Sequence, residues 1–165
     1  MMDWRQQSSE NCSIGRTLAV IGEKWTILVL RELFNGVRRF DEMQAHLDIP
    51  RPILSDRLNR LVDEGVLTRS EYRDPGQRTR HEYRLTEMGL DLQGVLISLM
   101  EWGDRYRADP AGPARVVRHR GCGEPLRVDL VCAAGHTVTS ARDVVGDPGP
   151  GARPLLAPAG SRPRS

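Results

Sequence analysis

Arginine supplies 23 of the 24 basic residues of this 165-residue chain, and Lys24 is the exception. The planar guanidinium group donates two parallel hydrogen bonds, a geometry that matches phosphate oxygens and the major-groove edge of guanine. This residue choice therefore favours a surface that contacts nucleic acid. A codon bias shared by the whole genome would give the same excess of arginine, and composition alone does not separate the two interpretations.

Side chains able to read base edges are concentrated between residues 51 and 60. Arginine can pair with guanine, asparagine with adenine, and an aspartate can accept from the cytosine amine. The candidates for DNA contact in this segment are Arg51, Ser55, Asp56, Arg57, Asn59 and Arg60. Asp56 and Arg60, four residues apart, could instead form an ordinary ion pair on a helix surface. Arg57 lies nearer the apolar side, where a phosphate contact and a pair with a nearby acid are both open.

A second group of polar and basic side chains surrounds Pro75-Gly76. It consists of Arg73, Gln77, Arg78 and Arg80. Their charge should attract phosphates or enter a narrow minor groove, which gives an affinity that falls steeply with salt. Simple solvation of a surface loop is the alternative. Arg38 and Arg39 precede a predicted helix and are further candidates for phosphate contact.

The chain has three cysteines, Cys12, Cys122 and Cys132. An odd and small number of cysteines does not make a disulfide scaffold and agrees with a reducing, cytoplasmic compartment. Cys12 lies at the start of a predicted helix, where backbone N–H groups stabilise a thiolate, so it is a candidate for redox or electrophile sensing. The alternative is a small apolar residue packed at the helix start.

Two histidines and two cysteines near the C-terminus have a spacing that could close a tetrahedral zinc site. The four residues are His119, Cys122, Cys132 and His136. Gly135 stands where a zinc ribbon would place a further thiolate, so the pattern departs from that motif. The competing interpretation is a hairpin without any cofactor that packs three apolar residues on the main domain, namely Val128, Leu130 and Val138.

Apolar residues at helical spacing predict the elements that position these groups. A stripe through Ile14, Leu18 and Ile21 continues to Leu28, and Gly22 either divides it into two short helices or bends one helix. Ser13 is the predicted N-cap, and Asn35-Gly36 ends the stripe. A short helix follows over residues 40–47.

Prolines 50 and 52 suit the start of the next helix, predicted over residues 51–64. Its apolar face consists of Leu54, Leu58, Leu61 and Val62, so the opposite face is exposed. Strands over residues 66–74 and 81–85 then form a hairpin, and Thr86 opens one final long helix.

Three helices, a hairpin and a closing helix indicate a mainly α fold with a small β-hairpin wing, a winged helix-turn-helix. We expect this domain to span residues 1–110. A small β-rich appendage should follow over residues 111–145, and a disordered tail rich in proline and glycine over 146–165.

Composition also argues against other classes of protein. Charged residues make up 28% of the chain, the mean hydropathy is -0.46 and no apolar run approaches the ~20 residues of a membrane span. No secretory signal is readable, and a cytoplasmic protein without a membrane partner is expected. The four histidines are scattered, and the sequence has no glycine-rich phosphate loop or nucleophile elbow, so we predict no enzymatic activity.

Several blocks of sequence, in order, resemble HxlR-type transcriptional regulators, relatives of the MarR group. They comprise residues 12–18, 21–26, 30–33, 36–43, 49–58 and 80–86 and the triplet Glu101-Trp102-Gly103. The resemblance implies a dimeric bacterial DNA-binding regulator without enzymatic activity. It also implies that Cys12 occupies a position at which some relatives carry a redox or electrophile switch. Pro52 departs from the pattern, because relatives usually carry a polar residue there.

A dimer follows from the limited reach of one recognition helix as well as from the resemblance. Two half-sites about one helical turn apart need a two-fold symmetric protein. The predicted interface residues are Ile14, Leu18, Ile21, Leu92, Leu96, Leu99 and Trp102. For Leu92, Leu96 and Leu99 the alternative is the core of a single chain.

These observations predict a homodimeric repressor that binds an inverted-repeat operator in double-stranded DNA. A small-molecule inducer or a redox signal would release it. The alternative function is a winged-helix module for protein interaction, without sequence-specific DNA binding. The near-neutral charge of residues 1–110 favours that alternative.

Overall fold

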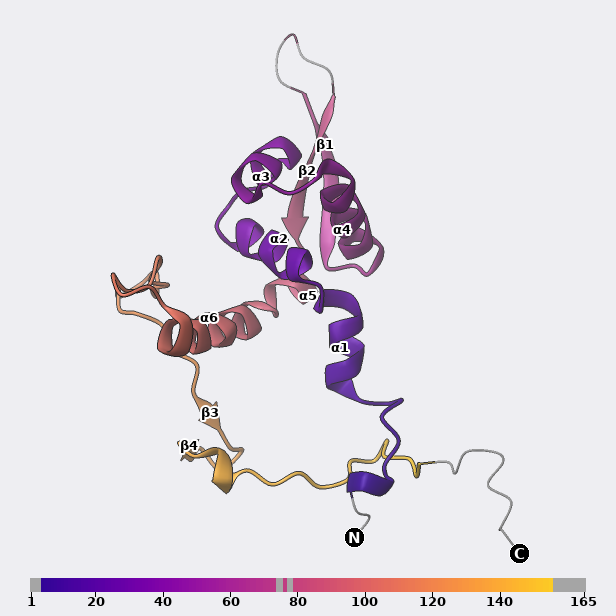
Figure 1. Ribbon diagram of the computed structural model, residues 1–165, viewed down its shortest axis with the longest axis vertical. Helices are drawn as coiled ribbons and strands as arrows, with labels where there is room; N and C mark the ends of the chain where they lie inside the picture. Colours follow the sequence, from indigo (N-terminus) through magenta and orange to yellow (C-terminus); the bar gives the residue numbers. More distant parts are fainter. Residues whose placement is uncertain (1–3, 74–75, 77–78, 156–165) are drawn as a thin grey trace, which may run out of the picture.

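The computed structural model describes residues 4–73, 76 and 79–155. Helices dominate the chain up to Arg107, with an antiparallel hairpin after the fourth α-helix (Figure 1). The elements of this part are η1 (Trp4–Gln6), α1 (Ser13–Ile21), α2 (Lys24–Phe34), α3 (Phe40–Leu47), α4 (Arg51–Asp63), β1 (Leu67–Tyr72), β2 (Arg80–Leu85), α5 (Glu87–Leu90) and α6 (Gln93–Arg107). Three short elements follow, β3 (Leu130–Val131), β4 (Thr137–Val138) and η2 (Ala141–Asp143).

The first apolar stripe forms two helices, α1 and α2, which was one of the two predicted outcomes. Gly22 separates them, and its N–H donates to the Leu18 carbonyl oxygen at 2.8 Å. A Cβ atom at Gly22 would lie 2.5 Å from that same oxygen, so only glycine fits this junction. The N-cap prediction was wrong by one residue: Cys12 caps α1, and its Sγ accepts from the Gly15 N–H.

The helix α4 spans almost the predicted range and presents the predicted faces. Pro50 and Pro52 lie at its start, where a missing N–H leaves no helical bond unmade. Leu54, Leu58 and Leu61 are fully buried and pack with α2, α3 and β1. The opposite face of α4 is consequently left in solvent.

The wing is a two-stranded antiparallel sheet in which Leu67 pairs with Leu85 and Tyr72 with Arg80. The segment before α3 extends it, because the Tyr83 N–H donates to the Arg38 carbonyl at 2.9 Å. Tyr83 is itself buried, which ties the wing to the helical core. The predicted loop residues Gln77 and Arg78 lie outside the described residues.

The closing segment forms two helices, α5 and α6, and the prediction of one long helix was wrong. Thr86 caps α5 as predicted, and its Oγ1 accepts from the Gly89 N–H at 3.2 Å. Gly89 is buried so tightly that a Cβ atom there would collide with the Val66 carbonyl oxygen. The chain turns after α5 at Asp91 and Leu92, where the Leu92 N–H donates to the Gly89 carbonyl oxygen at 3.2 Å, three residues back, as in a 3₁₀ turn.

Residues 111–155 contribute no side chain to the buried core among the described residues. The strands β3 and β4 pair as a small hairpin. The interpretation of this segment as a hairpin without a cofactor expected Leu130 to pack on the main domain, but Leu130 is 62% exposed. Val128 instead donates its N–H to the Glu101 carboxylate on α6, at 3.0 Å.

The first part of the expected tail, residues 146–155, is described and is exposed except at Ala152, and its last residues run beside the N-terminal segment (Figure 1). The Ser8 N–H donates to the Arg153 carbonyl at 2.8 Å, and the Leu155 N–H donates to that of Gln6 at 2.6 Å. Backbone pairing thus orders this part despite its composition. Residues 156–165 of the predicted tail lie outside the described residues.

Candidate nucleic-acid interface

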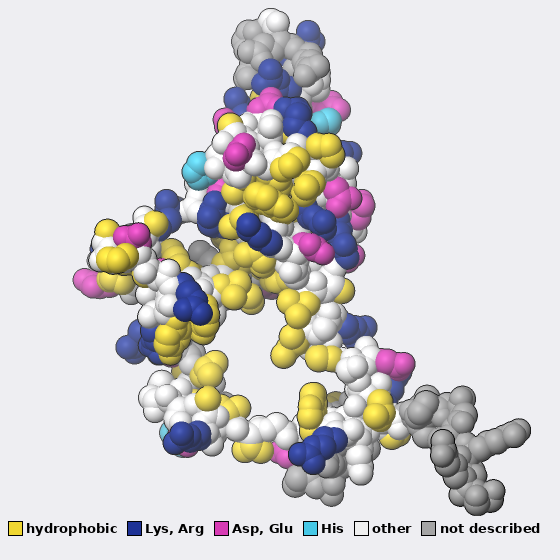
Figure 2. Space-filling view, in the orientation of Figure 1, with side chains coloured by type: hydrophobic (Ala, Val, Ile, Leu, Met, Phe, Trp, Pro, Cys, Tyr) yellow, Lys and Arg dark blue, Asp and Glu magenta, His cyan; other side chains and the backbone are white. Residues whose placement is uncertain are grey.

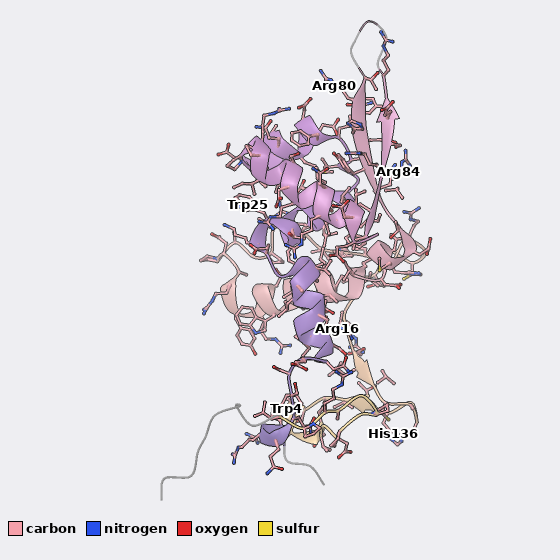
Figure 3. The ribbon with its side chains drawn as sticks, turned by 90° about the vertical axis from the view of Figure 1, so that its right-hand side faces the viewer. Trp4, Arg16, Trp25, Arg80, Arg84 and His136 are labelled. Atoms are coloured by element: carbon pink, nitrogen blue, oxygen red, sulfur yellow. The ribbon has the colours of Figure 1, made fainter. Side chains whose placement is uncertain are left out.

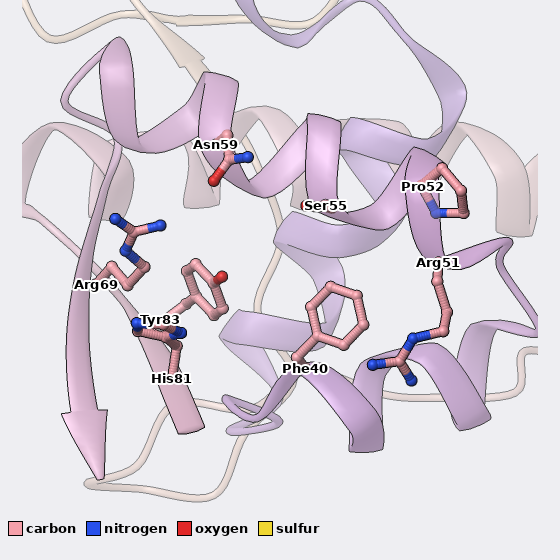
Figure 4. Close-up of a pocket in the computed structure, with 8 residues that line it drawn as sticks. All are labelled: Phe40, Arg51, Pro52, Ser55, Asn59, Arg69, His81 and Tyr83. Atoms are coloured by element: carbon pink, nitrogen blue, oxygen red, sulfur yellow. The ribbon is translucent and has the colours of Figure 1, made fainter. Parts of the chain in front are cut away.

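A cleft of about 490 Å³ lies between the exposed face of α4 and the wing (Figure 4). Its lining residues are Phe40 from α3, Arg51, Pro52, Ser55 and Asn59 from α4, and Arg69, His81 and Tyr83 from the wing. The cleft thus joins the two elements that the sequence predicts to contact DNA.

Ser55 and Asn59 lie one helical turn apart on α4, and both are exposed and line the cleft. A carboxamide at the tip of a short side chain can make the two hydrogen bonds that distinguish adenine. Pro52, one turn earlier, has no polar side-chain atom and offers only apolar contact. Among the predicted base-reading residues, the structure therefore brings Arg51, Ser55 and Asn59 together.

Three further candidates on α4 do not line this cleft. Asp56 is exposed, and its Oδ2 lies 3.7 Å from Arg57 Nη1, so its ion pair is with its neighbour rather than with Arg60. Arg57 is half-buried at the edge of the helix, and its Nε has no hydrogen-bond partner among the described residues. Arg60 turns toward α1, where its Nη2 donates to the Ala19 carbonyl at 2.5 Å.

Arg51 and Arg80 both pair with Asp41, in the first turn of α3. Arg51 Nη1 lies 3.1 Å from Asp41 Oδ1, and Arg80 Nη1 lies 3.2 Å from Asp41 Oδ2. Arg51 also donates to Gln44 Oε1 at 2.9 Å, and its guanidinium carbon is 4.9 Å from the centre of the Phe40 ring. These contacts hold Arg51 at the cleft and tie Arg80, which does not line the cleft, to the same carboxylate.

The sequence interpretation missed three wing residues that line the cleft, namely Arg69, His81 and Tyr83. Arg69 pairs with Tyr83 across the sheet, and His81 lies two residues before Tyr83, so all three share one face. Period-two alternation along the strands could have identified this face. Burial raises the pKa of Tyr83, and the nearby Arg69 partly offsets that rise, so its hydroxyl stays protonated at neutral pH.

The remaining predicted phosphate contacts lie around the wing. Arg38 and Arg73 are exposed, whereas Arg39 is half-buried, with its guanidinium carbon 4.3 Å from the centre of the Tyr72 ring. Figure 3 shows Arg80 at the wing end of the molecule, far from His136 and Trp4. Arg80 thus lies at the end of the protein opposite the appendage.

A buried carboxylate supports the helices beneath the cleft. Glu32 on α2 is 1% exposed, and it pairs with Arg31 at 2.7 Å and with His46 Nδ1 on α3 at 2.5 Å. Burial alone raises the pKa of Glu32, but the hydrogen bonds from His46 and Arg31 outweigh it and lower the pKa below 4.5. The ionised side chain thus holds α3 against α2.

Apolar side chains of α1 and α6 remain exposed in the single chain, and Figure 2 shows hydrophobic atoms gathered over these helices. Ile14, Leu18, Leu99 and Trp102 are more than half exposed, as a predicted interface requires. The prediction was wrong for Ile21, which is buried in the core of its own chain.

Two other predicted interface residues, Leu92 and Leu96, are half-buried against the same core. For these two, the alternative of an intramolecular role matches the packing. Leu99 stays more than half exposed on the same helix.

The cysteines and histidines assigned to sensing or zinc lie away from the cleft. Cys12 is half-exposed and caps α1, with its Sγ 3.5 Å from the Gly15 nitrogen. His119 Nδ1 is 3.2 Å from Cys122 Sγ, while Cys132 and His136 are joined through a backbone hydrogen bond of 3.0 Å. The structure does not gather these two pairs: no three His, Cys, Asp or Glu residues in its described part are placed to hold a metal ion.

Comparisons with known proteins place the same segment in a regulator family. The family described as HxlR-like helix-turn-helix matches residues 20–110. An uncharacterized HTH-type transcriptional regulator of Mycobacterium tuberculosis is 47% identical over 148 residues, which is 90% of this chain and 92% of the relative. The HTH-type transcriptional regulator YdeP of Bacillus subtilis is 32% identical over 107 residues, which is 64% of this chain and 82% of that protein.

Solved structures show the same fold. The protein PA1607, assigned as a transcription factor, aligns with a TM-score of 0.72 at 31% identity, covering 84% of this chain and 95% of that one. The redox regulator HypR in its oxidized form aligns with a TM-score of 0.53 at 29% identity, covering 59% and 100%. These similarities confirm the winged helix-turn-helix prediction. Within the described ranges, no helix is long and apolar enough to cross a membrane.

Proposed function

Because the chain belongs to the HxlR-like helix-turn-helix family of transcriptional regulators, we propose that it is a homodimeric repressor that binds an inverted-repeat operator in double-stranded DNA. The observation that carries the proposal is the exposed face of α4, with Ser55 and Asn59 opposite a basic wing across one cleft. A helix of this kind enters the major groove, and the wing contacts the flanking backbone.

Two copies of α4 are needed because one helix reads only a few base pairs. The exposed apolar residues of α1 and α6, which include Leu18 and Trp102, support an isologous pairing through these helices. Their burial in a dimer would remove apolar area from water, which stabilises the dimer by roughly 25 cal/mol per Å² of buried apolar surface. Repression then follows if the operator overlaps a promoter, where the bound dimer excludes the polymerase.

A mobility-shift titration with duplex DNA from upstream of the gene tests this function. We expect a slope of log affinity against log salt of about -0.9 for each phosphate contact, and tighter binding than to a scrambled duplex. Asn59→Ala should weaken binding to the upstream duplex and leave binding to the scrambled one unchanged.

Absence of duplex binding at low ionic strength would overturn the proposal. It would favour the second candidate, a protein-interaction module, to which the near-neutral charge of residues 1–110 points.

We further propose that Cys12 transmits a redox or electrophile signal, while a small-molecule inducer is the other route to release. Its thiol caps α1, a helix that carries part of the predicted interface, so oxidation would disturb the cap and the helix together. The fold similarity to the redox regulator HypR agrees with this role.

Peroxide is expected to release the wild-type protein from the operator and to leave Cys12→Ser bound, with a Cys122→Ser variant as the matched control. Mass spectrometry locates the modified thiol. Equal release of wild type and Cys12→Ser would contradict a sensing role for Cys12.

A further inference from the structure

Asp41 connects the two elements that are proposed to touch DNA. Its Oδ1 pairs with Arg51, in the first turn of α4, and its Oδ2 pairs with Arg80, in the first position of β2. Each oxygen of one carboxylate thus holds one arginine, at 3.1 and 3.2 Å. A phosphate group offers the same kind of oxygen pair to guanidinium groups.

The three side chains are accessible enough for DNA to compete with Asp41. The exposed fractions are 58% for Arg51, 39% for Arg80 and 49% for Asp41. Exposed ion pairs of this kind are weak, so a duplex phosphate can displace the carboxylate. Arg80 would also gain from the exchange, because its Nε is buried without a hydrogen-bond partner among the described residues.

We propose that Asp41 is a specificity-determining residue that stands in for a DNA phosphate in the free protein. Non-specific binding consists almost entirely of phosphate contacts, so a carboxylate that occupies two arginines weakens that binding most. In the operator complex, base contacts by α4 add to the binding, and arginines already held in place by Asp41 lose less conformational entropy. This inference rests on the proposed function and concerns the regulation of the same site.

The test compares Asp41→Asn with Glu42→Gln in the full-length protein. Both changes remove one negative charge from the first turn of α3, so they alter the net charge and the helix dipole interaction equally. Glu42 is exposed and forms no ion pair with an arginine among the described residues, so only the Asp41 change frees Arg51 and Arg80. Fluorescence anisotropy with a random-sequence duplex and with the operator duplex, each at several salt concentrations, measures both affinities.

For Asp41→Asn we expect several-fold tighter binding to random duplex than for Glu42→Gln. For Asp41→Asn, the slope of log affinity against log salt should be steeper by about 0.9 for each freed arginine that reaches a phosphate. Affinity for the operator should rise less, so the ratio of operator to random binding falls.

Equal affinities and slopes for the two variants would overturn this inference while wild-type binding still supports the proposed function. Weaker binding of Asp41→Asn to both duplexes would also overturn it, because Asp41 would then act only as an anchor. Failure of the wild-type protein to bind any duplex would overturn both.

Discussion

At the scale of the residue, Glu32 shows how a charge in the core is stabilised. The carboxylate is almost completely buried, and hydrogen bonds from Arg31 and His46 compensate for its lost hydration. Removing one partner of such a cluster leaves a buried polar group without its hydrogen bond, which lowers the free energy of unfolding by about 1–3 kcal/mol. Glu32 is thus a structural charge beneath the helices that form the cleft, and it does not line the cleft itself.

The lowered pKa of Glu32 gives its contribution to stability a defined dependence on pH. Stabilisation is fully present above the ordinary value of 4.5 and is lost as the pH falls through the lower pKa of the folded state. We expect Glu32→Gln to lower the free energy of unfolding by about 1–3 kcal/mol at pH 7. The difference from wild type should shrink below pH 4.5 in urea titrations.

The exposed Glu42→Gln serves as the control for this prediction and should change stability little at either pH. If Glu32→Gln lowers the free energy of unfolding by the same amount at pH 7 and at pH 3, Glu32 is not ionised in the folded protein.

At the scale of the element, Arg60 links α4, the proposed recognition helix, to α1. Its side chain does not line the cleft. Its guanidinium donates to the last turn of α1 through the Ala19 carbonyl. A charged donor to a backbone oxygen contributes about 1–2 kcal/mol. Arg60→Ala should therefore lower the free energy of unfolding by about that amount and leave the salt slope of DNA binding unchanged.

Chemical denaturation and anisotropy titrations check both parts of this prediction. Arg60→Lys is the matched variant, since it keeps the charge but loses the planar donor geometry. A salt slope that flattens by about 0.9 in Arg60→Ala would show that Arg60 contacts a phosphate instead.

The elements also show what the sequence could reveal and what it could not. The bounds of α4 were predictable because two prolines and leucines at helical spacing are local signals. The break between α5 and α6 was not, and the close approach of Gly89 to Val66, 23 residues earlier in the chain, is likewise a contact that local signals do not reveal.

The candidate site, too, was predictable only in part. Ser55 and Asn59 followed from the helical face that the leucines leave exposed. Arg69 and His81 did not, because the wing face toward α4 depends on strand register and on how the sheet docks. Likewise, the partner of Asp56 depends on side-chain conformation, so spacing alone suggested the wrong arginine.

At the scale of the whole molecule, the cleft and the exposed apolar helices lie in different regions. The wing and α4 occupy one end, while α1 and α6 face the middle of the molecule beside the appendage (Figures 1 and 2). Trp102 is 57% exposed on α6 and lies against Tyr106, with ring centroids 5.4 Å apart. This separation allows a dimer to form without covering the cleft.

If the proposed dimer forms through these helices, Trp102→Glu should convert it to a monomer, because a charge would be buried in an apolar contact. Val145→Glu is the control, since Val145 is similarly exposed but lies in the appendage. Sedimentation velocity measures the change, and circular dichroism verifies that each chain remains folded. A dimer that persists in Trp102→Glu would place the subunit contact elsewhere.

The turn at Asp91 and Leu92 joins a helix that is anchored, α5, to one that is only partly buried, α6. On one side, α5 is anchored by Thr86 and by the tightly packed Gly89. On the other, α6 has 15 residues and no fully buried side chain, and its length is about 22 Å at 1.5 Å per residue. A tilt of about 10° at this corner moves the far end of α6 by about 4 Å, on the order of one base-pair step along a duplex. In the proposed dimer, a small rotation between subunits at this turn would thus become a larger shift of the distance between the two copies of α4.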